Sequence, residues 1–272
     1  MIHLFCALSC EAEPIIQHFN LSKIKEFDLF RLYRSEDKNI SLAITGVGKM
    51  NAAAAVTYHH ACLSTFSADI WLNIGVAGHS SLPIGEACLI NKITDNQFGT
   101  TWYPQILFDI DCTNAPLITH DAVSYQYQDS LFDMEASGFY QMALRLGTAE
   151  LIHCLKIVSD NQQHSVENIK TDYVKKLISK NNMKIVQLLN SLKPLAKELS
   201  SINTAPKYYQ TLIEEYHLTK TERIQLLRLL NQWSVRFPND DIMYFVRNVK
   251  NGKSLHKKIT TKLIESDFII YD

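Results

Sequence analysis

Two carboxylates of this sequence stand beside apolar segments, where a surface acid is less expected. Glu135 lies between Met134 and Ala136 at the start of an apolar helical pattern, and Asp160 follows the apolar run 152–158 after one serine. An ionised carboxylate accepts several hydrogen bonds and can therefore bind the two hydroxyls of a sugar diol. A carboxyl group at a partly dry strand end can instead keep its proton and donate it. Glu135 thus suits hydroxyl binding, and Asp160 suits proton donation.

Both residues also have simpler interpretations. A glutamate in the first turn of a helix is favoured by the helix dipole. An aspartate after a strand often forms an Asx turn or caps a helix. The residue types and their positions leave these alternatives open.

Two glycine-containing turns provide places where a ligand can approach the backbone. The first runs from Thr45 to Asn51 and contains Gly-Val-Gly-Lys, and the second runs from Asn73 to His79. The first turn lacks the spacing of a Walker loop and the third glycine of a dinucleotide-binding fingerprint. Each turn indicates either a tight connection between a strand and the next element or a close approach to a ligand.

The segments that position these residues alternate short apolar runs with helical patterns, as in a sheet covered by helices. The predicted strands are 2–8, 40–45, 70–74, 87–93, 117–119 and 152–158. The predicted helices are 11–19, after Ser9 as a possible N-cap, 50–64 and 134–146. Ligands of open α/β sheets lie beyond the carboxyl ends of the strands. The residues that follow these runs are therefore the candidates for a site.

Composition indicates an ordinary globular chain with a large core. Of 272 residues, 46% are apolar and 20% charged, and the net charge is −1. No run reaches the roughly 18 to 20 apolar residues of a membrane span, and the apolar start has no Lys or Arg before it, so we expect a strand there and not a signal peptide. Six cysteines without a CxxC pair favour free thiols in a reducing compartment. We therefore expect a cytoplasmic protein.

Other chemistries have little support in the motifs. The histidines do not form an HExxH arrangement, and no Gly-x-Ser-x-Gly elbow occurs. Cys10 beside Glu11 has no identifiable base and is better interpreted as a small buried thiol. We expect neither a metal site nor another cofactor.

The C-terminal third differs from the rest of the chain. Residues 1–170 hold 10 Lys and Arg against 18 Asp and Glu, whereas residues 171–272 hold 17 against 10. The pattern predicts one long helix over 171–192, interrupted by Pro194, and a later helix capped by Thr219 with Glu222 at its third position. We expect a catalytic domain over 1–195 and a basic helical appendage over 206–272. The appendage could bind nucleic acid, contact the acidic body or remain solvated.

Six segments, taken together and in this order, carry a family resemblance. They are Ala7 to Ala12, Gly46 to Ala55, Asn73 to Gly78, Thr119 to Ala122, Asp133 to Ala136 and Lys156 to Asp160. With them the chain resembles the nucleoside phosphorylase and nucleosidase superfamily, most closely its 5′-methylthioadenosine/S-adenosylhomocysteine nucleosidase branch. The resemblance implies a three-layer αβα sandwich around a central mixed sheet, here with a C-terminal helical appendage. It also implies a homo-oligomer, with a dimer favoured.

The resemblance assigns roles to individual residues. Asp160 would protonate the leaving purine, Glu11 would take a proton from the attacking water, and Glu135 would bind the 2′ and 3′ hydroxyls and favour the positive charge that develops on the sugar. Met134 would pack under the sugar. The other positions that the resemblance places at the substrate are Gly75, Val76, Val123, Ser124, Lys156 and Ser159.

Some of these positions depart from the family pattern. An aromatic residue that stacks on the purine is replaced by Val123 and Ser124, an arginine near the water is replaced by Lys156, and a phosphate-binding serine is replaced by Val76. The rings that could take over the stacking role are Phe98, Trp102, Tyr103, Tyr125 and Tyr127, although core packing is the favoured interpretation of each.

The sequence thus predicts a purine nucleosidase that hydrolyses the N-ribosidic bond of a nucleoside such as 5′-methylthioadenosine or S-adenosylhomocysteine. The phosphate-binding arginines of phosphorylases are replaced by Glu11 and Asn73, and Glu11 would repel phosphate. Two alternatives stay open: a phosphorylase with a different phosphate site, and a degenerate nucleoside-binding module whose basic tail recruits nucleic acid or a protein partner.

Overall fold

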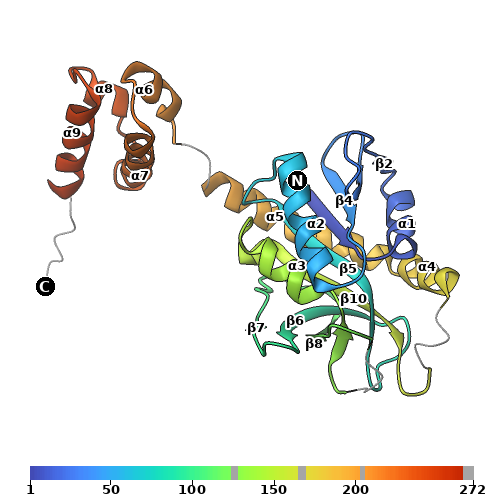
Figure 1. Cartoon of the computed structure of the whole chain (residues 1–272). Helices are drawn as coiled ribbons and strands as arrows, with labels where there is room; N and C mark the ends of the chain where they lie inside the picture. Colours follow the sequence, from blue (N-terminus) through green and yellow to red (C-terminus); the bar gives the residue numbers. More distant parts are fainter. Residues whose placement is uncertain (124–127, 165–169, 203–205, 266–272) are drawn as a thin grey trace, which may run out of the picture. The chain divides into compact units, whose positions relative to one another are not determined.

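The apolar runs form one mixed sheet in the computed structural model, which describes residues 1–123, 128–164, 170–202 and 206–265 (Figure 1). Within these residues the sheet has ten strands. They are β1 (Ile2–Cys6), β2 (Ser22–Lys23), β3 (Arg31–Arg34), β4 (Ile40–Ile44), β5 (Ile70–Gly78), β6 (Ala87–Asp95), β7 (Thr101–Trp102), β8 (Thr113–Thr119), β9 (Leu131–Asp133) and β10 (Ile152–Asp160).

The middle of the sheet is parallel and buried. Strand β1 pairs in parallel with β4 and β5, and β10 pairs in parallel with β5. All residues of β1 and β10 are buried, as expected for strands that are covered on both faces. Because these strands are parallel, their carboxyl ends meet at one edge of the sheet, and the turns after them lie close together.

Strand β5 joins this parallel part to a second group of strands. It pairs with β9 as well as with β1 and β10, and β9, β8, β6 and β10 pair in succession. The strands β5, β9, β8, β6 and β10 therefore close on themselves. The closure brings β9, which carries Phe132 and Asp133, beside the end of β5 at Gly78.

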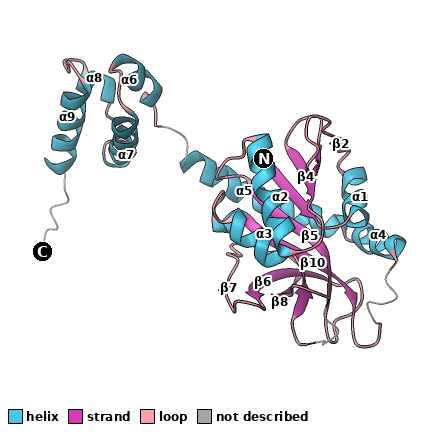
Figure 2. Ribbon diagram, in the orientation of Figure 1, coloured by secondary structure: helices cyan, strands magenta, loops and turns pink. Residues whose placement is uncertain are grey.

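Helices cover both faces of the sheet (Figure 2). Helices α2 (Lys49–Leu63) and α3 (Ala136–Ala143) pack with one apolar cluster, around Trp71 and Phe139. Helices α1 (Ser9–His18), α4 (Thr171–Lys180) and α5 (Asn182–Ile202) pack with the other, around Leu72 and Leu188. A short 3-10 helix, Ala149–Leu151, precedes β10. The predicted three-layer αβα fold around a mixed sheet with a C-terminal helical region is confirmed.

Some predicted boundaries are wrong. The single helix expected over 171–192 is two helices, because Asn181 lies between them and its amide donates to the carbonyl oxygens of Gly85 and Leu177. Pro194 does not interrupt the second helix but lies inside it. Helix α1 has Leu8, not Ser9, at its N-cap, and the Leu8 N–H is bound by the Glu11 side chain.

The chain divides into two compact units, Met1–Ile202 and Asn203–Asp272. The second unit contains α6 (Tyr209–Glu215), α7 (Lys220–Arg236), α8 (Ile242–Val246) and α9 (Gly252–Glu265). It has its own apolar core, which includes Leu226, Leu230, Trp233 and Ile259. The predicted capping box at α7 is present, since Thr219 accepts the Glu222 N–H and Glu222 accepts the Thr219 N–H. Among the described helices, none is long and apolar enough to cross a membrane.

His153 should make stability depend on pH. The ring is fully buried in β10, and burial lowers its pKa from 6.5 to about 4. Between these values the unfolded chain binds a proton that the folded chain does not, so the free energy of unfolding falls as the pH drops from 6.5 to about 4. Over this pH range, we expect the free energy of unfolding of wild type to fall by about 1.4 kcal/mol per pH unit more than that of His153→Gln.

Urea denaturation of both proteins at intervals between pH 7 and pH 4 measures this difference. Other titrating groups are common to the two proteins and cancel. Parallel stability curves for wild type and His153→Gln would show that the ring does not titrate differently on folding.

Candidate active site

Glu11 lies in the first turn of α1, directly beyond β1. Its side chain is buried, with Oε2 accepting the Leu8 N–H at 2.8 Å and Oε1 accepting the Val76 N–H at 2.9 Å. The carboxylate therefore joins the turn after β1 to strand β5. Burial raises the pKa of Glu11, and the two N–H groups oppose that shift because they favour the ionised form.

Glu135 joins α3 to α2. It is the N-cap residue of α3, and its Oε1 accepts the N–H of Gly48, the N-cap residue of α2, at 2.8 Å. Glu135 is thus the N-cap residue of α3 and not a residue of its first turn, and its carboxylate binds the N-terminus of α2. Burial and the charge of Asp133 raise the pKa of Glu135 to about 7, while Lys156 opposes the shift.

Lys156 places a buried positive charge among these carboxylates. Its side chain is 2% exposed, and Nζ lies 2.8 Å from Oδ2 of Asp133, whose side chain is 1% exposed. Asp133 also accepts the Thr119 hydroxyl and the Ala136 N–H, each at 2.9 Å. Burial lowers the pKa of Lys156, but the charges of Asp133 and Glu135 outweigh burial and hold it above its usual range. Lys156 therefore stays protonated.

Asp160 ends β10 and is also buried. Ser159 Oγ donates to its Oδ1 at 2.5 Å, which fixes the orientation of the carboxyl group. The backbone of Asp160 pairs with Gly78, just as Lys156 pairs with Gly75 earlier on the same strand. Asp160 is thus held at the strand edge, beyond the Lys156 cluster.

The two glycines of β5 explain how the charged groups approach the strand so closely. A Cβ built on Gly75 would lie 2.8 Å from Glu11 Oε1 and 3.5 Å from Lys156 Nζ. A Cβ built on Gly78 would overlap the ring of Phe132 and lie 2.6 Å from Asp160 Oδ2. Glu11 and Asp160 therefore both approach β5, at positions three residues apart.

The structure brings most of the predicted residues to this strand edge. Glu11, Gly75, Val76, Lys156, Ser159 and Asp160 lie on or against β5 and β10, and Met134, which is half-buried, and Glu135 follow β9. Val123 differs, because its side chain is 53% exposed. Ser124, Tyr125 and Tyr127 lie outside the described residues.

Sequence reasoning missed two residues, Asp133 and Phe132. Asp133 lies in one of the six segments that carry the resemblance, but the resemblance gives it no role, and its partner Lys156 is 23 positions further along the chain. Phe132 is not one of the rings that the sequence offers as a substitute for the stacking residue. The signal for both was their place directly before Met134 and Glu135, within a strand of only three residues.

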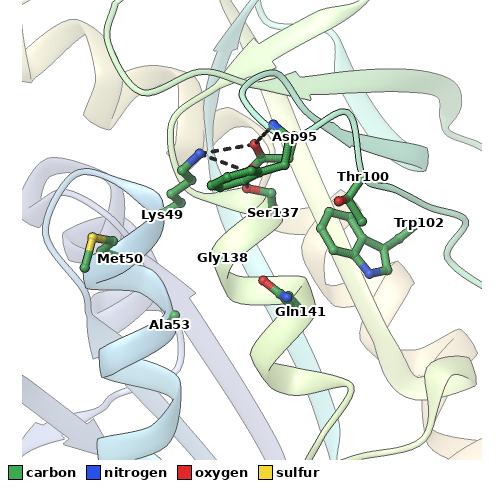
Figure 3. A pocket seen from close by; sticks show the side chains of 10 residues that line it. Lys49, Met50, Ala53, Asp95, Thr100, Trp102, Ser137, Gly138 and Gln141 are labelled. Carbon is green, nitrogen blue, oxygen red and sulfur yellow. Dashed lines mark hydrogen bonds and ion pairs between the residues drawn. The ribbon is translucent and has the colours of Figure 1, made fainter.

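A cavity of about 420 Å³ is lined by residues of α2, α3 and the β6–β7 region, among them Lys49, Asp95 and Ser137 (Figure 3). Neither Glu11 nor Asp160 lines it. Lys49 Nζ contacts Asp95 at 3.1 Å and Asp121 at 2.9 Å. Phe98 and Trp102, two of the rings proposed from the sequence, line this cavity, and Tyr103 is 63% exposed.

A metal site has no donor set in the described part of the chain. No group of three His, Cys, Asp or Glu side chains there could hold a metal ion. The buried carboxylates at the strand edge are instead bonded to backbone N–H groups, to a hydroxyl and to Lys156.

The fold is that of the nucleosidases in the superfamily that the sequence resembles. A 5′-methylthioadenosine/S-adenosylhomocysteine nucleosidase from S. pneumoniae with a transition-state inhibitor has a TM-score of 0.57 at 16% identity, covering 70% of this chain and 99% of its own. The Colwellia psychrerythraea 34H nucleosidase in complex with adenine has a TM-score of 0.57 at 15% identity, covering 70% and 95%. Futalosine hydrolase of Helicobacter pylori strain 26695 has a TM-score of 0.56 at 14% identity, covering 70% and 97%.

A family match supports the same assignment. Residues 2–126 match the model of the phosphorylase superfamily. No curated protein matches the sequence significantly. The family match and the shared fold agree with the superfamily resemblance that the sequence motifs indicated.

Removing Lys156 should destabilise the protein strongly. Lys156→Met leaves the buried Asp133 carboxylate without its counter-ion, and we expect a loss of about 3 to 5 kcal/mol in the free energy of unfolding. The double variant Asp133→Asn, Lys156→Met should recover much of this loss, because no buried charge of the pair is then uncompensated. Urea denaturation measures both.

The matched control is Lys175→Met. Lys175 forms an ion pair of 2.6 Å with Glu13, and both side chains are at least one third exposed. We expect a change below about 1 kcal/mol for this surface pair. A loss in Lys156→Met as small as in the control would contradict a buried, structurally required ammonium.

Proposed function

We propose that this protein hydrolyses the N-ribosidic bond of a purine nucleoside, of the 5′-methylthioadenosine or S-adenosylhomocysteine type. The observation that carries the proposal is the placement of three buried carboxyl groups, Glu11, Glu135 and Asp160, around the end of β5. The solved structures with this fold include nucleosidases in complex with adenine and with a transition-state inhibitor, and they support this class of reaction.

Two of the carboxyl groups, those of Glu11 and Asp160, have partners that suit proton transfer. Glu11 lies against Gly75, and Asp160 lies against Gly78 at the carboxyl end of β5. Asp160, oriented by Ser159, is placed to protonate the leaving base. Glu11 keeps lone pairs beyond its two backbone partners and can accept a proton from water.

We assign to Glu135 the binding of the sugar hydroxyls. Its Oε1 is held by the Gly48 N–H, so the carboxylate has a fixed direction, and its remaining lone pairs can accept hydrogen bonds from the sugar hydroxyls. Positive charge develops on the sugar as the base departs. A buried, preorganised carboxylate stabilises that charge without reorganisation.

The charges of this site favour water over phosphate as the molecule that attacks the sugar. The Lys156 ammonium at the cluster is bonded to Asp133, so its charge is already compensated. Asn73, which occupies a position that corresponds to a phosphate-binding arginine in phosphorylases, is buried and donates to the carbonyl oxygen of Phe5 at 3.2 Å. Glu11, Asp133 and Glu135 would repel an inorganic anion.

The reaction class is tested by product analysis. We expect free adenine from 5′-methylthioadenosine or S-adenosylhomocysteine in phosphate-free buffer, measured by chromatography, with no acceleration by added phosphate. Asp160→Asn should release base at least about 100-fold more slowly, because a positioned acid is lost. Strict dependence on phosphate would instead establish a phosphorylase, and folded wild type without turnover would leave only a binding module.

Activity should fall on acidification through the ionisation of Glu135. The pKa of this residue is about 7, and the ionised form is the one that binds a diol and stabilises positive charge. We therefore expect kcat/KM to rise with pH between 5 and 8, with an acid limb near pH 7. Glu135→Gln should lower kcat/KM and remove this limb. A limb that persists in the variant assigns the titration to another group.

A further inference from the structure

His79 is a buried histidine directly after β5, and it has no part in the reaction proposed above. Only 5% of the residue is exposed. Its Nδ1 accepts the N–H groups of Ser81 and Leu82, each at 3.1 Å. A ring nitrogen that accepts hydrogen bonds carries no proton, so the ring is neutral and its proton is on Nε2. The ring thus folds the chain that follows β5 back on itself.

These contacts close a circuit of hydrogen bonds that includes Asp160. The His79 N–H donates to the carbonyl oxygen of Asp160 at 3.0 Å. Asn161, the next residue, donates from its side-chain Nδ2 to the carbonyl oxygen of Leu82 at 3.0 Å. Leu82 is in turn bound to the His79 ring through its N–H. The turn 79–82 and the end of β10 are therefore joined at two points, and the ring is one link of the circuit.

Two backbone hydrogen bonds extend this arrangement to neighbouring segments. The Ser80 N–H donates to the carbonyl oxygen of Gln128 at 3.1 Å, and the Gln162 N–H donates to the carbonyl oxygen of Ser80 at 3.3 Å. The segment before β9, the turn after β5 and the segment after β10 therefore meet beside His79. A displacement of the turn 79–82 would consequently shift the backbone that carries the proposed acid, Asp160.

The surroundings of His79 favour its neutral form. Nε2 lies 3.8 Å from Oδ1 of Asp129, whose side chain is 99% exposed. A second acid nearby is Asp160 on β10, whose carbonyl oxygen accepts the His79 N–H. Burial lowers the pKa of the ring from 6.5, and the charge of Asp129 opposes this shift without cancelling it. A proton on Nδ1 would leave the Ser81 and Leu82 N–H groups without their acceptor.

We propose that neutral His79 is a positioning residue for Asp160, which it holds through the turn 79–82, and that protonation of Nδ1 releases this turn. The effect on catalysis rests on the proposed nucleosidase function, whereas the hydrogen-bond circuit exists without a substrate. The ring acts on the reaction through the backbone of β10. An acid held in one position needs no reorientation when the base departs.

Hydrogen exchange of the Ser81 and Leu82 amides, followed by NMR on the full-length chain, tests the circuit without turnover. His79→Phe fills the site but offers no acceptor. We expect both amides to exchange roughly 5- to 150-fold faster in this variant, because two buried donors lose their acceptor. His79→Asn should restore protection, since an asparagine oxygen can accept N–H groups two and three residues further on. NMR of the wild-type ring should show the proton on Nε2.

The pH dependence of exchange separates a titrating ring from a purely structural one. When the turn opens, the ring reaches water, where its pKa is 6.5, so opening takes up a proton below that value. Between pH 7.5 and pH 5.5, wild type should lose up to about tenfold more protection than His79→Asn, after correction for the intrinsic pH dependence of exchange. Equal losses in the two proteins would overturn the role of protonation.

Base-release assays at pH 8 test the positioning of the acid. His79→Phe should lower kcat by up to about 100-fold with KM nearly unchanged, because the acid is displaced while the contacts to the sugar remain. His79→Asn should stay within a few-fold of wild type. His79→Leu serves in the same way if the phenylalanine variant does not fold.

The matched control is His60→Asn. His60 is a half-buried histidine in the last turn of α2, and its Nδ1 hydrogen-bonds the Thr65 hydroxyl, so this variant should protect Ser81 and Leu82 as wild type does. The proposal is overturned if a folded His79→Phe keeps wild-type protection of these amides, or if it loses protection but keeps the wild-type kcat. Protection that depends on His79 in a wild type without turnover would support the circuit and reject only the hydrolase.

Discussion

The ion pair of Lys156 and Asp133 is the constraint on which the rest of the candidate site depends. An ammonium and several carboxyl groups are buried together at the end of a parallel strand. A buried charge is tolerated only when it is compensated and hydrogen-bonded, so each member restricts the others. The distances between Glu11, Glu135 and β5 are consequently fixed by electrostatics as much as by apolar packing.

Two glycines of β5 leave room for the buried charged side chains. Gly75 and Gly78 are the positions on β5 that Lys156 and Asp160 face, and larger residues there would overlap the side chains around them. The N-terminus of α2 meets Glu135 through the Gly48 N–H. The glycines that looked like turn residues in the sequence thus have a second role, which is to give the buried side chains room.

Much of the site could be predicted because its residues follow strands in a recognisable order. Apolar runs lie next to Glu11, Glu135 and Asp160 in the sequence. The topology of parallel strands brings the residues that follow such runs together. Asp133 and Phe132 could not be assigned in this way. Asp133 contacts Lys156 and Phe132 contacts Gly78, and no local pattern records such contacts because the partners are remote in sequence.

The helices and strands can be divided in the same way, into those that a local pattern predicts and those that depend on contacts between residues remote in sequence. The periodicity of apolar residues predicted the layers of the sheet, whereas the three-residue strand β9 is too short to produce a pattern. The break at Asn181 depends on a hydrogen bond to Gly85, which lies 96 residues away in sequence. Pro194 is accommodated within α5 because Leu188, Leu189 and Leu192 before it and Leu195 and Leu199 after it pack against the same core.

The Lys156–Asp133 pair also sets a barrier to change over evolution. The single ammonium of the cluster would be a natural starting point for a lineage that acquired an anionic co-substrate, but it is already neutralised by its neighbour. Replacing Asp133 alone would release the ammonium and also free the Thr119 hydroxyl and the start of α3 from their acceptor. A switch of nucleophile would therefore require several coordinated substitutions, and single steps along that route would produce poorly folded intermediates.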